Sequence, residues 1–314
     1  MTFASPADVE RYGEYGPGRL DVSSGWNRPR YPFRGRVTAD GSSGYPAEPG
    51  RYHLYASYAC PWSQRSVIVI GLTGLRDVVS VSYVDDARDG RGWAFRAARG
   101  PDPVNGFALL QEAYDATEPG YPGHLSIPVL WDRAEGRIVS NNFPDISLDL
   151  GTAFDAYGDP SVRLYPEHLR AEIDELNAWV YENVNNAPYQ AAAATTQADH
   201  DAWRARLTDA FDTLDGRLAD RRHLHGDALT ESDVRLWPTL ARFDLLYNPM
   251  SGLTERPLSS WEHLWAYARD LYARPAFREA TDLPALPPLL ARAATIVNPG
   301  VRRLRIEPVH PGWS

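Results

Sequence analysis

The sequence of 314 residues predicts an α/β domain followed by an all-α helical domain. In residues 51–152, short runs rich in β-branched and aromatic side chains flank one apolar run of helical length, which predicts strands around a helix. In residues 161–283, apolar side chains recur three or four positions apart, the period of a helix with one buried face. The chain also exceeds the roughly 250 residues at which a single core stops growing.

The first domain shows a β-α-β unit followed by a β-hairpin, which is the thioredoxin-like order. The predicted elements are a strand from Arg51, a helix containing 67–72, a strand over 78–84, and a hairpin of two strands, 127–131 and 137–139. Residues 85–125 form a polar insertion rich in Gly and Pro. Because so long a segment is rarely an idle loop, we expect it to line a site.

The second domain is predicted to follow a linker near 151–160. Its expected helices cover an apolar face from Leu169 to Val184 and the segments 202–218, 233–247 and 261–272, with Thr230 and Asp233 as a capping pair. Both ends of the chain are predicted to be irregular. Residues 1–50 form an arm, and the prolines of 284–314 predict a tail that wraps over the body.

The composition excludes several classes of protein. The net charge of -9 argues against nucleic acid or an anionic membrane as a partner, because both require a basic face. No stretch approaches the roughly 20 apolar residues of a membrane span, and no signal-peptide pattern is present, so we expect a cytoplasmic protein. The 32 basic residues are all arginine, which is typical of GC-rich bacterial coding.

The single cysteine, Cys60, is the candidate nucleophile, since one cysteine allows neither an internal disulfide nor a cysteine-based zinc site. It lies where the first strand turns into the helix, and the N–H groups of a helix start stabilise a thiolate. Pro61 suits the first helical turn, and Trp62 can shield the sulfur. Position 63 is Ser, so an external thiol must resolve any mixed disulfide. The alternative is an inert thiol in the core.

Ile127 and Pro128 precede the third strand. In a thioredoxin-like domain, a cis proline at this place turns the preceding backbone toward the sulfur and offers an edge to an extended thiol peptide. We therefore expect a cis Ile127–Pro128 bond and assign both residues to the thiol-binding site.

Six stretches of sequence, in order along the chain, are typical of one family. They are 51–62 (Arg-Tyr-His-Leu-Tyr-Ala-Ser-Tyr-Ala-Cys-Pro-Trp), 92–95, 127–132, 173–177, 184–186 and 229–236, and Asn298-Pro299 fits as well. The sequence thus resembles the Xi-class glutathione transferases, the glutathionyl-hydroquinone reductases, over most of its length.

This resemblance implies the glutathione-transferase architecture, a homodimer and no tightly bound cofactor. It implies an enzyme in which the thiolate of Cys60 attacks the sulfur of an S-conjugated hydroquinone and a second small-molecule thiol, such as glutathione, regenerates the enzyme. By motif position, Tyr189 and Tyr247 would supply protons to the quinone or hydroquinone substrate, with Tyr272 a weaker candidate. Trp93 would cover the bound thiol.

Two departures from the family pattern concern the thiol. The family motif S-N-E-S is here Ser140-Asn141-Asn142-Phe143, which removes the carboxylate and the hydroxyl that grip the γ-glutamyl end of glutathione. The usual arginine after the glycine of the insertion is absent, with His124 near its place. Because GC-rich actinobacteria use the sugar-based thiol mycothiol, we expect Asn141, Asn142 and His124 to face a neutral polyol thiol, with glutathione as the alternative.

Two other functions fit the same fold. A glutaredoxin-like thiol–disulfide oxidoreductase could use the same sulfur, and a non-catalytic ligand-binding protein could keep the fold without the chemistry.

Neither Asp85-Asp86 nor the pair His223 and His225 has a third ligand at a credible spacing, so we predict no metal site and interpret them as surface charge and loop polarity. No Gly-rich phosphate loop occurs, which argues against a nucleotide cofactor.

Overall fold

The computed structural model describes residues 2–15, 31–293, 296–310, 312 and 313. These residues divide into two compact units at the Val162–Arg163 bond, here called unit 1 and unit 2. Residues 16–30 of the predicted arm, with Trp26, and residues 294–295, 311 and 314 of the predicted tail lie outside the described residues. Among the described residues, no helix is both long and apolar enough to cross a membrane.

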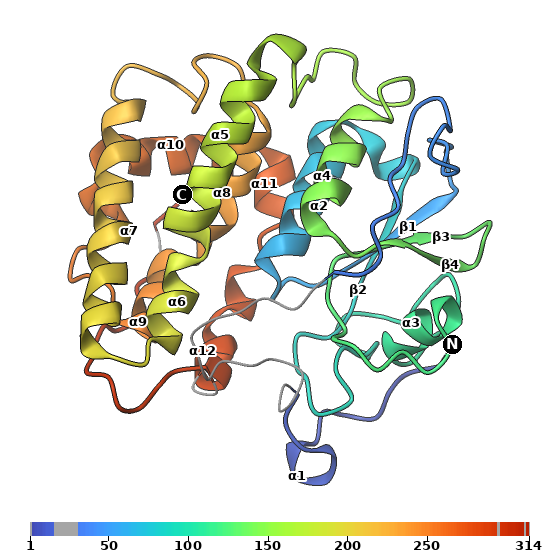
Figure 1. The fold of residues 1–314 in the computed structure, drawn as a ribbon, viewed down its shortest axis with the longest axis horizontal. Coiled ribbons are helices and arrows are strands. Elements are labelled where there is room, and N and C mark those ends of the chain that lie inside the picture. Colours follow the sequence, from blue (N-terminus) through green and yellow to red (C-terminus); the bar gives the residue numbers. More distant parts are fainter. Residues whose placement is uncertain (1, 16–30, 294–295, 311, 314) are drawn as a thin grey trace. The chain divides into compact units, whose positions relative to one another are not determined.

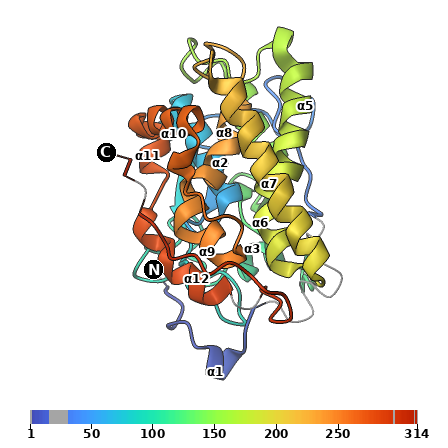
Figure 2. The same ribbon diagram turned by 90° about the vertical axis from the view of Figure 1, so that its left-hand side faces the viewer.

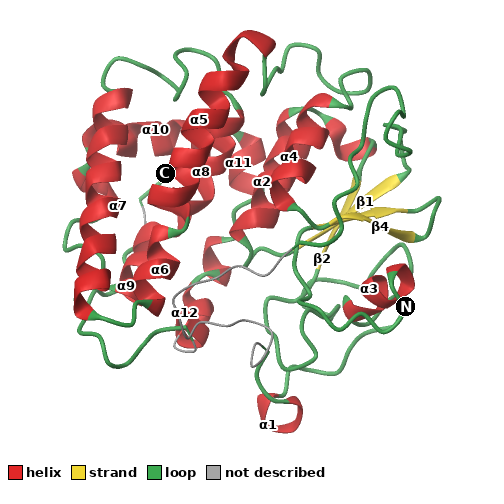
Figure 3. Cartoon of the chain, viewed as in Figure 1, coloured by secondary structure: helices red, strands yellow, loops and turns green. Residues whose placement is uncertain are grey.

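The described part of unit 1 contains a four-stranded mixed sheet (Figure 3). Its strands are β1 (Tyr52–Ala56), β2 (Ser80–Tyr83), β3 (Val129–Asp132) and β4 (Arg137–Ser140), in the spatial order β2-β1-β3-β4. Strand β1 runs parallel to β2 and antiparallel to β3, and β3 and β4 form the hairpin. The predicted β-α-β and β-β order is confirmed.

Helices α2 and α4 of unit 1 lie side by side and pack against each other (Figure 1). The helices of this unit are α1 (Val9–Tyr12), α2 (Pro61–Leu72), a 3₁₀ turn (Leu75–Asp77), α3 (Gln111–Thr117) and α4 (Phe143–Thr152). The side chains of Leu54, Ile68 and Ile146 are fully buried and come from β1, α2 and α4. The sequence predicted neither α3, inside the insertion, nor α4.

The described parts of the arm have little regular structure, but backbone bonds tie them to unit 1. Gly35 N donates to Val139 O of β4 (2.9 Å), and Gly90 N of the insertion donates to Gly13 O (2.7 Å). A Cβ added at Gly90 would lie 1.9 Å from Tyr12 O, so this close approach requires glycine. The insertion therefore carries the N-terminal segment on its surface.

Unit 2 is helical, as predicted. Its helices are α5 (Arg170–Val180), α6 (Ala187–Ala193), α7 (Gln197–Leu218), α8 (Glu231–Arg242), α9 (Asn248–Ser251), α10 (Glu262–Ala273), α11 (Pro275–Glu279) and α12 (Pro287–Ala293), with 3₁₀ turns at Glu167–Leu169, Leu258–Ser260 and Leu283–Ala285. The predicted capping box of Thr230 and Asp233 begins α8. Two segments predicted as continuous helix widen into π-helical turns, Tyr181–Asn185 and Phe243–Tyr247.

The C-terminal tail packs on unit 2. Beyond α12 it passes the turn that joins α6 to α7 (Figure 2), where Asn298 N donates to Ala192 O (3.1 Å). Near its end Trp313 is almost fully buried, with its ring centroid 5.3 Å from that of Trp237 and 5.0 Å from that of Trp265. The tail thus forms part of the core of this unit.

Candidate functional site

Cys60 is the N-cap residue of α2, immediately after the loop that leaves β1. Pro61 occupies the first helical turn, where its missing N–H removes no needed donor. The Ser63 N–H donates to Cys60 Sγ (3.4 Å), and Cys60 is 7% exposed. The sulfur therefore occupies the place at a helix start where backbone donors favour a negative charge.

The backbone carbonyl of Ile127 is the second partner of the sulfur. The Cys60 thiol donates to Ile127 O (3.3 Å), and the Ile127–Pro128 peptide bond is cis, as expected from the sequence. The two contacts favour opposite protonation states, since the Ser63 N–H stabilises a thiolate and the Ile127 carbonyl accepts from a thiol. A ligand N–H that took the place of the thiol at Ile127 O would leave the sulfur with the Ser63 donor alone.

The loop before Cys60 is anchored by Asp86. Asp86 Oδ1 accepts from Ser57 Oγ (2.8 Å) and from Ala59 N (2.9 Å), and Arg99 Nε donates to Oδ2 of the same carboxylate (2.9 Å). The interpretation of Asp86 as surface charge is therefore wrong, because its carboxylate fixes the backbone on which the cysteine is presented. Among the described residues, no group of three or more His, Cys, Asp or Glu side chains could hold a metal ion.

Trp62 packs into a stack that the sequence did not predict. Its ring lies 4.5 Å from that of Phe143, and the guanidinium of Arg65 lies 4.6 Å from the Trp62 ring and 5.4 Å from the Phe143 ring. Arg65 is fully buried, which strengthens a cation–π contact. The side chain of Phe143, at the position where the sequence resemblance predicts a hydroxyl, is therefore part of an apolar stack.

Trp93 and His124 belong to one group of side chains, here called the insertion cluster, with Tyr15 and Arg88. The Arg88 guanidinium lies 4.2 Å from the Trp93 ring and 5.0 Å from the Tyr15 ring. His124 Nδ1 forms a hydrogen bond with Tyr15 Oη (3.0 Å), and Leu125 N donates to the same oxygen (2.9 Å). A cation, an imidazole and aromatic faces suit either a carboxylate or a polyol.

Asn141 and Asn142 differ in their surroundings. Asn141 is 1% exposed, and its amide accepts from Phe33 N (3.2 Å) and donates to Ser126 Oγ (3.0 Å), so it joins the arm to the segment before Ile127. Asn142 is half-buried at the N-cap of α4, and its Nδ2 donates to Asp145 Oδ2 (2.6 Å). Of these two asparagines, therefore, Asn142 alone has part of its side chain exposed, where a ligand could reach it.

Tyr189 and Tyr247 meet in unit 2. Their hydroxyl oxygens are 2.9 Å apart, and their ring centroids are 5.4 Å apart. Either hydroxyl can be the donor, and the phenol that accepts from the other has its phenolate stabilised while its own proton stays available, which suits a proton donor. Tyr272 does not join them, because its ring packs on Trp237 (6.0 Å) and Trp313 (5.6 Å).

Comparisons with known proteins agree with this fold. Residues 196–270 match the family model "Glutathione S-transferase, C-terminal domain". The chain is 37% identical over 277 residues to glutathionyl-hydroquinone reductase YqjG of Escherichia coli, which covers 85% of this chain and 84% of YqjG. It is 43% identical over 234 residues to glutathionyl-hydroquinone reductase PcpF of Sphingobium chlorophenolicum, which covers 74% of each chain.

Solved structures show the same likeness. The glutathione-bound structure of YqjG superposes with a TM-score of 0.81 at 36% identity, covering 85% of this chain and 90% of YqjG. The glutathione-S-transferase Xi from Phanerochaete chrysosporium superposes with a TM-score of 0.83 at 35% identity, covering 91% and 98%. Because the likeness covers most of this chain and of each relative, the protein is a glutathione-transferase-like, thiol-dependent enzyme that belongs to the Xi-class glutathionyl-hydroquinone reductase family.

Proposed function

We propose that the protein removes a low-molecular-weight thiol from S-conjugated hydroquinones, or from related aromatic thioethers, through a mixed disulfide on Cys60. The observation that carries this proposal is the place of the Cys60 sulfur at the start of α2, between the Ser63 N–H and the Ile127 carbonyl. It is also supported by the relatives YqjG and PcpF, which are named glutathionyl-hydroquinone reductases.

The proposed reaction has two steps. The Cys60 thiolate attacks the sulfur of the thioether, a Cys60–S–S–R bond forms, the bond from sulfur to the aromatic carbon breaks, and that carbon keeps the electron pair and takes up a proton. A second thiol then attacks the mixed disulfide, so that a free disulfide leaves and Cys60 is restored. The hydroquinone carbon is reduced, and the sulfur of the thioether and the sulfur of one free thiol are oxidised to a disulfide.

Binding of the thiol substrate would also prepare the nucleophile. An extended thiol peptide that lies along the Ile127–Pro128 backbone would donate an N–H to Ile127 O. If that N–H takes the place of the thiol, the Cys60 sulfur loses its acceptor and keeps the Ser63 N–H, a change that favours the thiolate. The proton of the aromatic carbon is assigned to the hydrogen-bonded pair Tyr189 and Tyr247.

The thiol is proposed to be glutathione or mycothiol. The solved YqjG structure contains glutathione. In this chain Asn142 and Phe143 replace the motif carboxylate and hydroxyl, and Phe143 packs on Trp62, which favours a thiol without a charged γ-glutamyl end. A glutaredoxin-like exchange is the second candidate, because position 63 is Ser and the sulfur of Cys60 has no second cysteine to resolve its mixed disulfide.

The deciding experiment combines turnover with intact mass. Wild-type protein incubated with an S-conjugated hydroquinone, prepared once with glutathione and once with mycothiol, should release the hydroquinone and show one thiol adduct. The adduct is unambiguous because the chain has one cysteine. Cys60→Ala should lose about 1,000-fold or more of the turnover, since removal of a nucleophile leaves only binding effects. Unchanged turnover in Cys60→Ala, or no release by wild type with either conjugate, would reject the proposal.

A further inference from the structure

The C-terminal tail contacts both elements that carry the tyrosine pair. We propose that Arg303 is a positioning residue for Tyr189 and Tyr247, acting through the end of α6 rather than through the substrate. The inference rests on the proposed function, in which this pair supplies the proton, and it adds a residue that none of the sequence motifs contains.

Arg303 and Asn298 close the C-terminus of α6, the short helix that carries Tyr189. Arg303 Nη2 donates to Ala192 O (2.9 Å), and Asn298 Nδ2 donates to Ala194 O (3.0 Å). The last carbonyls of any helix lack partners inside the helix, and a cation there also faces the negative end of the helix dipole. In a helix of seven residues these contacts involve a large part of the backbone.

Arg303 is itself fixed by the tail. Its Nη1 donates to Asn298 O (2.7 Å) and to Val301 O (3.0 Å), so one guanidinium joins three backbone carbonyl oxygens. A planar guanidinium presents its donors in a rigid fork, which sets the direction as well as the distance of these bonds. The Arg303 guanidinium therefore links the backbone of the tail to the C-terminal end of α6.

The same tail segment contacts the element that carries Tyr247. Val309 N donates to Asp244 O (3.0 Å), and Asp244 lies in the π-helical turn Phe243–Tyr247. A Cβ added at Gly252, which follows α9, would lie 2.7 Å from Arg303 Cβ, so the tail rests directly on this backbone. One continuous segment thus touches the supports of both tyrosines.

Helix α6, which carries Tyr189, also contacts helix α9, which follows the turn that carries Tyr247. Ser251 Oγ of α9 donates to Pro188 O of α6 (2.7 Å), next to the 2.9 Å bond between the tyrosine hydroxyls. Proton transfer depends on such a distance, and a displacement of about 1 Å can slow a reaction by about 100-fold. Release of the α6 end from Arg303 should therefore slow the step that needs the acid and leave the chemistry of the Cys60 sulfur unchanged.

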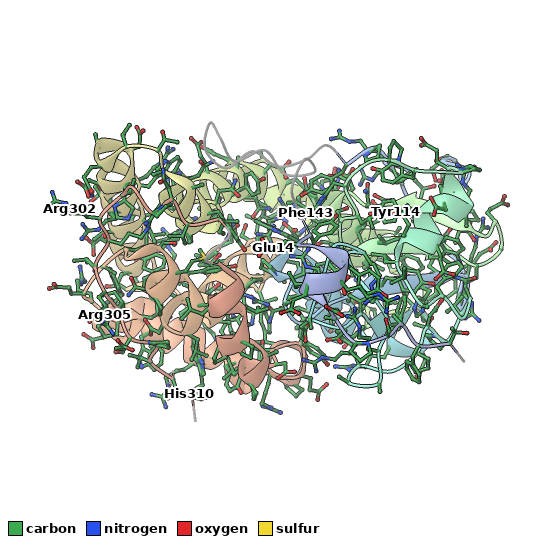
Figure 4. The ribbon with its side chains drawn as sticks, turned by 90° about the horizontal axis from the view of Figure 1, so that it is seen from below. Glu14, Tyr114, Phe143, Arg302, Arg305 and His310 are labelled. Carbon is green, nitrogen blue, oxygen red and sulfur yellow. The ribbon has the colours of Figure 1, made fainter. Side chains whose placement is uncertain are left out.

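The test compares three variants of the full-length protein. Arg303→Ala removes the contact, Arg303→Lys keeps a cation and a donor, and Arg302→Ala is the matched control, because Arg302 and Arg305 point outward (Figure 4). For Arg303→Ala we expect kcat of thioether cleavage to fall about 10-fold to 100-fold. The KM for the thiol and the rate at which Cys60 reduces a small mixed disulfide should stay unchanged. Arg303→Lys should restore most of kcat.

Each outcome decides the proposal. Wild-type kcat in Arg303→Ala, equal loss in Arg302→Ala, or parallel loss of thioether cleavage and disulfide exchange would overturn it. If Arg303→Ala does not fold, Val309→Pro is the second variant. It removes the N–H that donates to Asp244 O, and the Val309 side chain that it replaces is exposed. It must show the same selective loss. Absence of thioether cleavage in the wild type would instead reject the proposed function, so the two failures are distinct.

Discussion

The two groups to which we assign the chemistry are held in different ways. In unit 1 the Cys60 sulfur is set by backbone groups of regular elements, the Ser63 N–H at the start of α2 and the Ile127 carbonyl before β3. In unit 2 the pair Tyr189 and Tyr247 stands on a helix of seven residues and on a π-helical turn.

The Cys60 sulfur and the tyrosine pair depend on distant residues to different degrees. A helix start and a strand edge are fixed by hydrogen bonds of the elements themselves, so the place of the nucleophile needs few additional contacts. A short helix is marginal by itself, and a π-helical turn is a rare conformation that neighbours must support. The tyrosine pair should therefore respond to changes far from it along the chain, whereas the nucleophile should respond chiefly to loss of its loop anchor, Asp86 with Arg99.

Among the changes that should affect the two groups differently, removal of one tyrosine hydroxyl has the largest expected effect. Tyr247→Phe and Tyr189→Phe should each lower thioether cleavage by about 100-fold, within the range of general acid catalysis. Disulfide exchange at Cys60 needs no proton on carbon, so its rate should stay at the wild-type value. Both activities are measured as initial rates with the same thiol.

The double variant sharpens this prediction. Because the two hydroxyls form one 2.9 Å hydrogen bond, the loss in Tyr189→Phe/Tyr247→Phe should be close to that of the worse single variant and well below the product of both. Tyr272→Phe is the matched control, since that ring lies in the cluster with Trp313. Additive losses, or an equal loss in disulfide exchange, would contradict a shared role of the pair.

The same difference explains what the sequence could predict. Cys60 could be located because a strand, a proline and an apolar run mark a helix start, and the N–H of Ser63, three residues on, faces the cap for the same reason. Tyr15 could not be found, because it meets His124 across 109 positions and lies in a segment without a period. The role proposed for Arg303 could not be predicted either, because Arg303 belongs to none of the sequence motifs.

The errors in the helices have physical reasons as well. Helix α4 begins at Phe143-Pro144, and a proline in a polar context predicts a loop as readily as a first helical turn. The π-helical turns keep the apolar spacing of a helix while they add a residue to one turn, so periodicity alone predicted continuous helices.

Asn141 was predicted to face the thiol, but its side chain is buried among hydrogen-bond partners from three separate segments.

One buried group in each unit, His53 in unit 1 and Asp244 in unit 2, should also respond to acid in opposite directions. In unit 1, burial lowers the pKa of His53 to about 4, and its ring bonds Ser80 Oγ (2.7 Å) and Ser82 Oγ (2.8 Å). In unit 2, burial raises the pKa of Asp244 to about 6, although the Leu258 N–H opposes the shift.

The sign of each effect follows from which state binds more protons. Between pH 6.5 and 4 the unfolded state binds a proton at His53 that the folded state does not, so unit 1 loses up to about 3 kcal/mol as pH falls. Between pH 6 and 3.8 the folded state binds a proton at Asp244 that the unfolded state does not, so this group adds up to about 3 kcal/mol of stability over that range. Hydrogen exchange measured at pH 6.5 and pH 4.5 should show faster opening of the sheet and slower opening of the Phe243–Tyr247 turn.

Isosteric variants test the assignment of these two groups. Asp244→Asn keeps an acceptor for the Leu258 N–H and removes the titration, so the acid-induced protection of the Phe243–Tyr247 turn should be lost. His53→Gln should likewise remove the acid-induced opening of the sheet around His53. If both units lose protection together at pH 4.5, or if neither variant changes the profile, the opposite responses do not come from these groups.

The smallest expected effect concerns the choice of thiol in unit 1. Asn142→Glu restores a carboxylate at the N-cap of α4, where the helix dipole favours it and where the ammonium of a γ-glutamyl group would pair with it. The variant also loses the 2.6 Å bond from Asn142 Nδ2 to Asp145 Oδ2 and places two carboxylates together, which opposes the gain. We therefore expect the KM for glutathione to fall by about 10-fold at most, with the KM for mycothiol unchanged or higher. Asn142→Gln, with the same length and no charge, should leave both KM values near the wild type, and an equal fall in Asn142→Gln would show that charge at this position does not choose the thiol.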